Sequence, residues 1–206
     1  MYQPPSEPTP SPGRMMAFID GENLVCRFQE MRKAGREPHP EVLYVPDVYA
    51  WYYGVIQPQL NVVIRATYYT YCTGNSERAA EISDAIKGMQ FQQYVPLGQV
   101  MRARLLDRLY PRVFTKQKNR AGKGVDIQLT VDALGHTFQN NVDTVYLVTG
   151  DGDYEPLITE CQRQGKQVIV AALSSGLNPR LPRIADMFID LDPQFFRAPP
   201  ATPPET

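Results

Sequence analysis

Short apolar segments rich in β-branched residues alternate with amphipathic stretches through most of this chain. Such segments are typical of strands buried on both faces of a parallel sheet, with helices as the crossover connections. We therefore expect an α/β fold in which a doubly wound, mainly parallel sheet is flanked by helices. The expected strands are residues 15–19, 61–71, 144–149, 167–172 and 188–191.

The stretches between these strands carry helix signals. Pro46 with Asp47 resembles a helix start for the aromatic run 48–53. This run, around Trp51, is expected first to pack in the core; a dimer face and a base-stacking platform are the alternatives. Further helices are expected after Asp20 to about residue 33, from Asn75 or Ser76 to about residue 91, over 125–138 and over 154–164. The helix over 125–138 has an apolar stripe at helical spacing, made of Ile127, Val131, Leu134 and Phe138.

Length and composition favour one domain with two tails. A chain of 206 residues leaves little room for a second core. Residues 1–13 and 198–206 are rich in Pro, Ser and Thr, so we expect disorder there. We place the folded domain at 14–192 and a Pro-rich C-terminal tail at 193–206. The chain shows neither a secretory signal nor an apolar run long enough to span a membrane, so a cytoplasmic protein is expected.

Charge and reactive side chains limit the chemistry. The chain has 3 cysteines and 2 histidines, scattered in a way that argues against a disulfide framework or a zinc site, so carboxylates must carry any catalysis. The net charge is −1, so contact with nucleic acid would need a local basic patch. The stretch 94–123 supplies one, with a solvated loop and helix face as the alternative. Its cations are Arg102, Arg104, Arg108, Arg112, Lys116, Lys118, Arg120 and Lys123, against the single acid Asp107.

Two of the buried strands end in acids. The first runs into the sequence DGEN at 20–23, and the third into DGD at 151–153. In parallel α/β sheets, ligands bind beyond the carboxyl ends of the strands. Carboxylates at short range oppose each other's ionisation unless a cation neutralises them. An all-oxygen set of ligands suits Mg²⁺ or Mn²⁺ rather than zinc, and hydrolysis of a phosphodiester is the natural chemistry for such a site.

Each acid also has a structural interpretation. Asp20 could be a turn acid, and the DGD sequence at 151–153 could cap the helix that follows. Asp126 stands in the first turn of its helix, where the macrodipole favours an acid without any catalytic role. Asp132 falls on a different face of the same helix and is expected at the surface or behind the site. Only the joint occurrence of the acids favours a metal site.

These motifs together resemble the NYN domain, in particular its LabA-like (DUF88) branch within the PIN-like nuclease superfamily. The matching segments are FIDGEN at 18–23, KGVDIQLTVDAL at 123–134 and VTGDGDYEPLI at 148–158, followed by GKQV at 165–168. The resemblance covers about residues 14–190 and implies a PIN-like (NYN) sheet, bound Mg²⁺ or Mn²⁺, and hydrolysis of RNA. It implies Asp20, Asp126, Asp151 and Asp153 as the catalytic and metal-binding acids, with Asn23 and Thr149 as supporting residues. The long insertion before Lys123 and the tails depart from the pattern and leave the substrate open.

The expected function is a metal-dependent endoribonuclease, in which a metal-activated water attacks the RNA phosphodiester. Cations that would draw in the RNA backbone are Lys116, Lys118, Arg120 and Lys123. The main alternative is a catalytically inactive RNA-binding or regulatory module with the same fold. A nucleotide-sugar transferase motif would leave Asp20 and Asp126 unexplained, a toprim site expects a glutamate at Asp20, and a dinucleotide-binding domain needs a GxGxxG series that is absent. A homodimer, and protein partners bound through the tails, remain open.

Overall fold

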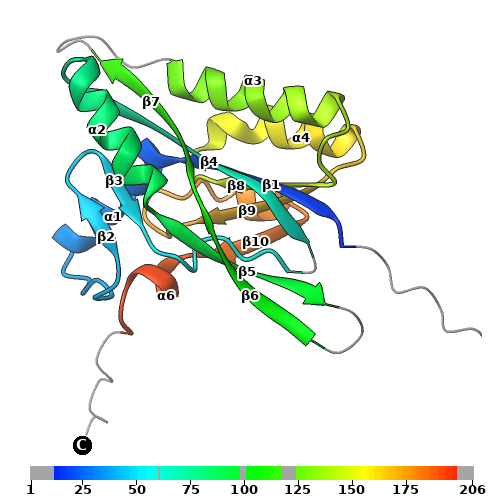
Figure 1. Ribbon diagram of the computed structural model, residues 1–206, viewed down its shortest axis with the longest axis horizontal. Coiled ribbons are helices and arrows are strands. Elements are labelled where there is room, and N and C mark those ends of the chain that lie inside the picture. Colours follow the sequence, from blue (N-terminus) through cyan, green and yellow to red (C-terminus); the bar gives the residue numbers. More distant parts are fainter. Residues whose placement is uncertain (1–11, 60, 98–100, 117–123, 199–206) are drawn as a thin grey trace, which may run out of the picture.

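The computed structural model describes residues 12–59, 61–97, 101–116 and 124–198. Its centre is a six-stranded sheet in the order β10-β9-β8-β1-β4-β7, in which every neighbouring pair is parallel (Figure 1). The strands are β1 (Arg14–Asp20), β4 (Val62–Thr73), β7 (Tyr110–Lys116), β8 (Thr144–Val148), β9 (Gln167–Ala172) and β10 (Met187–Asp190). The expected α/β fold with a parallel sheet is confirmed.

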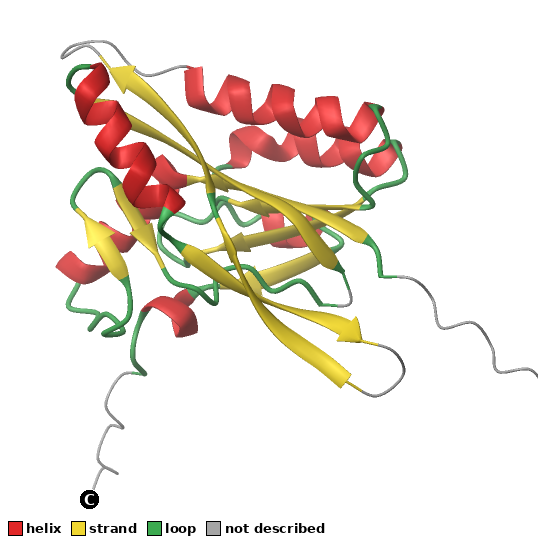
Figure 2. Ribbon diagram, in the orientation of Figure 1, coloured by secondary structure: helices red, strands yellow, loops and turns green. Residues whose placement is uncertain are grey.

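Helices cover both faces of this sheet (Figure 2). One face carries α1 (Gly21–Lys33) and α2 (Ser76–Lys87), and the other carries α3 (Gly124–Phe138) and α4 (Glu155–Arg163). The buried side chains accordingly form two cores, one on each face. Shorter helices are the 3-10 turn η1 (Gly152–Tyr154), α5 (Leu181–Ile184) and α6 (Asp192–Phe195). No helix within the described ranges is both long and apolar enough to cross a bilayer.

The basic stretch after residue 90 is more regular than the sequence suggested. It forms an antiparallel hairpin of β5 (Gln90–Leu97) and β6 (Met101–Arg108), and then β7, which becomes the edge strand of the main sheet. The prediction of an irregular loop and helix there is wrong. Basic residues alternate with apolar ones in this stretch, so the charge pattern concealed the two-residue period of a strand.

The aromatic run around Trp51 is also a strand. A hairpin of β2 (Leu43–Val45) and β3 (Tyr49–Trp51) replaces the helix expected to start at Pro46. Asp47 turns the chain with a positive φ of 57°, and Val48 N–H donates to the Val45 carbonyl at 3.1 Å. Trp51 is 1% exposed, which confirms the core as its first-ranked location.

Helix α3 turns a different face to the sheet than the sequence indicated. Of the expected stripe, Ile127, Val131 and Phe138 are 63%, 55% and 58% exposed, so the prediction of the packing face is wrong. The side chains that α3 buries are Val125, Leu129, Ala133 and Thr137. The helix thus carries two apolar stripes, and the one with smaller residues lies on the sheet, where it permits close approach.

The folded chain also continues beyond the boundary expected at residue 192. Phe195 and Phe196 are buried, and both rings pack on Phe28 of α1 at centroid distances of 5.6 and 5.2 Å. The predicted start of the C-terminal tail at 193 is therefore too early. Residues 1–11 and 199–206, where the tails were predicted to be disordered, lie outside the described residues.

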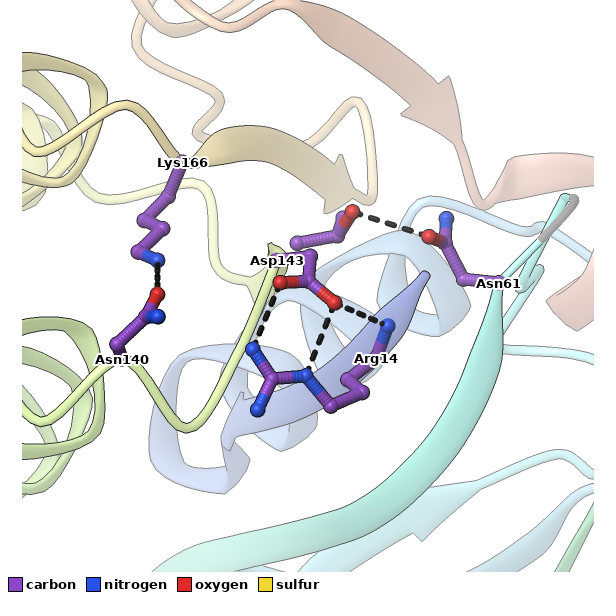
Figure 3. A network of polar contacts seen from close by, with 6 residues as sticks. Arg14, Asn61, Asn140, Asp143 and Lys166 are labelled. Atoms are coloured by element: carbon purple, nitrogen blue, oxygen red, sulfur yellow. Dashed lines mark hydrogen bonds and ion pairs between the residues drawn. The ribbon is translucent and has the colours of Figure 1, made fainter. Parts of the chain in front are cut away.

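Hydrogen bonds between Arg14 and Asp143 form a polar clamp that joins the starts of β1 and β8 (Figure 3). The acids follow the opposite, carboxyl ends of these two strands. The Arg14 guanidinium donates to both carboxylate oxygens of Asp143 at 2.8 and 3.0 Å, and its backbone N–H donates to the same carboxylate at 2.8 Å. These bonds lower the pKa of Asp143 to about 2. Nearby, the Thr144 hydroxyl donates to Asn61 at 3.2 Å. The clamp thus ties together the starts of the two strands whose other ends lead into the acids.

Candidate functional site

The carboxyl ends of β1 and β8 place Asp20 next to Thr149. Ile19 and Val148 are paired in the sheet, so the residues that follow them lie side by side. The Thr149 hydroxyl donates to Oδ2 of Asp20 at 3.0 Å. Asp20 is only 3% exposed, so its carboxylate is buried at the carboxyl end of β1.

Asn23 connects the first turn of α1 with the turn after β8. Its backbone N–H donates to Oδ1 of Asp20 at 3.0 Å, which makes Asp20 the N-cap of α1. Its side-chain oxygen accepts a hydrogen bond from the Gly150 N–H at 3.0 Å. The two residues predicted to support the site, Asn23 and Thr149, therefore both orient Asp20 or its surroundings.

Asp151 and Asp153 lie in the tight turn after β8. The Asp151 N–H donates to the Thr149 hydroxyl at 3.2 Å, and the Asp153 N–H donates to Oδ1 of Asp151 at 3.0 Å. Asp151 caps η1 and is partly buried, while Asp153 is exposed. Asp151 thus caps the short turn η1, whereas α4, the helix that this motif was considered to cap, begins after Tyr154 without a side-chain cap.

Asp126 reaches the same region from the first turn of α3. The Tyr71 hydroxyl accepts hydrogen bonds from the Gly124 and Val125 N–H groups at 2.6 and 2.9 Å, so a side chain of β4 anchors the start of the helix. Oδ1 of Asp126 accepts a hydrogen bond from the Tyr154 hydroxyl at 3.1 Å. Asp126 is therefore fixed from two directions.

Tyr154 lies close to three of the acids, and no role was predicted for it from the sequence. It is 2% exposed, and its pKa is raised, first by burial and then by the charges of Asp20, Asp126 and Asp151. Three of the predicted acids thus lie within electrostatic range of one hydroxyl. The only sequence signal was a tyrosine placed directly after the acidic turn.

The electrostatics of the site centre on Asp20. Burial, which disfavours the charged form, raises its pKa to about 7. The Asn23 N–H and the Thr149 hydroxyl oppose this shift, while the negative charges of Asp126 and Glu22 add to it. A buried carboxylate with acidic neighbours is stabilised in its charged form by a cation.

The oxygen donors of the site suit a hydrated divalent metal ion. Within the described part of the chain, no three His, Cys, Asp or Glu side chains gather closely enough to hold one ion together. Mg²⁺ does not require this, because it usually binds through one or two carboxylates and keeps several waters for contact with substrate phosphates. The oxygen-only chemistry and the mutual influence of Asp20 and Asp126 fit such a hydrated ion.

Of the four basic residues predicted to bind RNA, the structure describes the position of one. Lys116 is the last residue of β7. Lys118, Arg120 and Lys123 lie outside the described residues. The structure does bring other cations near α3: Arg65 and Lys87 line one recess together with Asp132. They were missed because they are far from the basic stretch in the sequence.

Gly21 is required by close packing beside Asp20. A Cβ atom there would lie 2.2 Å from Cε1 of Tyr68 and 2.6 Å from the Tyr69 carbonyl oxygen. We expect Gly21→Ala to lower the free energy of unfolding by about 1–3 kcal/mol, because the buried Tyr68 ring must move. Gly135→Ala in α3 is the control, since nothing lies within 4 Å of its Cβ position; it should raise stability by about 0.5–1 kcal/mol. Urea midpoints measure both, and equal effects would contradict the packing argument.

The sequence profile of the NYN domain family matches residues 14–192. The chain belongs to the NYN domain family. NYN domains are nuclease-like, and this membership agrees with a parallel sheet whose strand ends carry acids. One relative of this NYN protein, "Uncharacterized protein MJ0482" from Methanocaldococcus jannaschii, is 32% identical over 119 residues. The alignment includes 58% of this chain and 47% of MJ0482, so the match spans about half of that relative's length.

The fold of the NYN protein is also similar to a solved structure. The crystal structure of a protein of unknown function, VPA0982 from Vibrio parahaemolyticus, superposes with a TM-score of 0.55 over 93% of this chain and 100% of that chain. Sequence identity between the two is 18%. The likeness shows a shared fold.

Proposed function

We propose that this NYN protein is a metal-dependent ribonuclease of the LabA-like (DUF88) branch, and that it cuts RNA internally in the cytoplasm. The observation that carries the proposal is the buried Asp20, which is oriented by Thr149 and Asn23 and lies within electrostatic range of Asp126. A carboxylate held in this way is costly to ionise without a cation. Such a site is suited to a divalent ion and a phosphodiester.

In this proposal Asp20, Asp126, Asp151 and Asp153 would hold Mg²⁺ or Mn²⁺ between them, one or two of them directly and the others through waters on the ion. The bound ion would supply a water of lowered pKa and would stabilise negative charge on the scissile phosphate. Thr149 and Asn23 keep the Asp20 carboxylate turned into the crevice, and Tyr154 holds Asp126. These residues fix the acids before substrate arrives, so little reorganisation is needed during the reaction.

Asp153 is suited to a separate step. Asp153 is exposed, whereas Asp20 is buried and Asp151 is partly buried; Asp126 is exposed as well but already accepts a hydrogen bond from Tyr154. An exposed carboxylate beside the other acids can accept the proton of the attacking water, which is the role of a general base. The proton then passes to solvent.

A second function is favoured by one specific observation. Several of the acids already have structural roles: Asp20 caps α1, Asp151 caps η1, and Asp126 accepts from Tyr154. A protein that kept these roles and lost turnover would be an RNA-binding or regulatory module with the same fold. It would bind RNA without cutting it, and protein partners could be recruited through the tails.

Incubation of the purified protein with single-stranded and structured RNAs distinguishes the ribonuclease from the RNA-binding module. We expect cleavage products in Mn²⁺ or Mg²⁺ and none when EDTA is in excess, because the acids alone cannot activate water. Gel electrophoresis of end-labelled RNA gives the products and shows whether cuts are internal. RNA that binds and stays intact in every metal would replace the ribonuclease proposal with the binding module.

A further inference from the structure

A recess opens beside α3, along the sheet from the acids. Its volume is about 330 Å³, and it lies between α3, β4 and β7 on the face that also carries Asp20. The walls combine aromatic rings, cations and one carboxylate. The residues that matter for its chemistry are Arg65, Tyr69, Lys87, Tyr110, Arg112 and Asp132.

The sheet register connects this recess to the acids. Asp20 pairs with Tyr69 across β1 and β4, and Tyr69 pairs with Arg112 across β4 and β7. Side chains at paired positions of parallel strands point to the same face, and neighbouring strands lie about 4.8 Å apart. Arg112 is thus two strand spacings, roughly 10 Å, from the backbone of Asp20. Tyr69 stands between them in the sheet, and its hydroxyl donates to Asp132 at 2.8 Å.

The charge of the recess is positive. Arg65, Lys87 and Arg112 line it together with one acid, Asp132, and Lys87 also pairs with Asp84 of its own helix at 2.9 Å. The Arg112 Nε lies 3.8 Å from Asp132, and the Arg112 side chain remains 55% exposed. A chain with a net charge of −1 thus has a local basic recess next to its acidic strand ends, which is the arrangement that a polyanion crossing both would need.

The recess also offers flat surfaces. The Arg65 guanidinium lies over the Tyr110 ring at 4.6 Å from its centroid, and Tyr110 is 48% exposed. Guanidinium planes and tyrosine rings are the side chains on which unpaired bases stack. A duplex keeps its bases stacked inside the helix, so only a single strand can use both the cations and the flat groups.

We propose that this recess binds single-stranded RNA next to the phosphate held at the acids. Arg65, Lys87 and Arg112 contact the backbone phosphates, and a base stacks on Tyr110 and Arg65. The inference rests on the proposed function in taking RNA as the ligand. It adds two points to that function. The RNA leaves the acids along α3 toward the edge strand β7, and unpaired RNA is preferred over a duplex.

Fluorescence anisotropy of a short labelled RNA tests this site without relying on cleavage. With EDTA present, we expect the double variant Arg65→Gln and Arg112→Gln to lower affinity at least about tenfold, and to reduce the slope of log affinity against log salt by about one to two. Tyr110→Leu should weaken binding of the single strand roughly tenfold and that of a duplex of the same sequence hardly at all. Wild type should bind the single strand more tightly than the duplex.

Matched controls remove a positive charge elsewhere. Arg78→Gln and Arg163→Gln each delete an exposed arginine that pairs with a glutamate on its own helix, and both should leave RNA affinity unchanged. Arg65→Lys with Arg112→Lys keeps the charge and should restore the salt slope. Equal losses in the controls and the double variant, or equal affinity for single strand and duplex, would overturn the proposal. Arginine-dependent binding without any cleavage would sink the ribonuclease proposal and leave this one standing.

Discussion

Replacing Asp151 by asparagine is expected to slow metal-dependent RNA cleavage at least about 100-fold, since even residues behind a metal ligand affect activity by roughly 10- to 100-fold. Asparagine keeps the side-chain oxygen that accepts the Asp153 N–H, so the turn after β8 should hold its shape. What is lost is one of the three negative charges that act on Tyr154, the others being those of Asp20 and Asp126. Initial rates of RNA cleavage in Mn²⁺ measure the loss, and thermal unfolding checks that the fold is intact.

Asp190→Asn is a closely matched control. Asp190 also ends a parallel strand of the same sheet, and its Oδ1 accepts the Asp192 N–H at 2.9 Å. It lies at the outer strand β10, away from β1. We expect its cleavage rate to equal that of wild type. If Asp151→Asn cleaves as fast as Asp190→Asn, the acids after β8 do not serve the reaction.

Binding of Mn²⁺ is expected to depend steeply on pH because of Asp20. The pKa of this carboxyl is raised to about 7, so below that value a proton must leave before the metal binds. Apparent affinity should rise about tenfold per pH unit well below the pKa, or roughly 50-fold from about pH 5 to about pH 7, and then level off. The stability of the metal-free protein changes with pH in the opposite direction. The folded state holds this proton more tightly than the unfolded state, so the free energy of unfolding falls as pH rises toward 7.

Isothermal titration calorimetry in two buffers with different ionisation enthalpies measures the proton released. The Asp20→Asn variant is the control: it has no proton to lose, and any remaining Mn²⁺ binding should follow a flatter pH curve. A wild-type affinity that is flat between about pH 5 and about pH 7 would mean that Asp20 is not a ligand.

Much of this architecture could be predicted from the sequence because burial leaves a strong pattern. Residues of β1 and β8 are buried on both faces, and their continuous apolar runs ending in acid–glycine turns indicated both the strands and the crevice. The cap at Asn75 was predicted for the same kind of local reason, since its side chain accepts the Arg78 N–H. Features fixed by neighbours in sequence were therefore accessible.

Features that depend on partners far away in the sequence could not be predicted. Nothing in the sequence shows that Tyr71 anchors α3 or that Tyr154 donates to Asp126, because both bonds depend on tertiary packing. The same holds for α3, where two stripes of apolar residues satisfied the helical period and only the sheet decides which is covered. Arg65 and Arg112 are far apart in the chain, and the recess that they share exists only once β4 and β7 pair.

The bond between Thr149 and Asp20 joins residues 129 positions apart. During synthesis the N-terminal part of a chain emerges first, at about 5–20 residues per second. A nascent chain that ends before β8 has Asp20 without the strand, the hydroxyl or the acidic turn that complete the crevice. Unfinished chains should therefore be unable to cleave RNA, because the group of acids is complete only when nearly the whole sheet has been made.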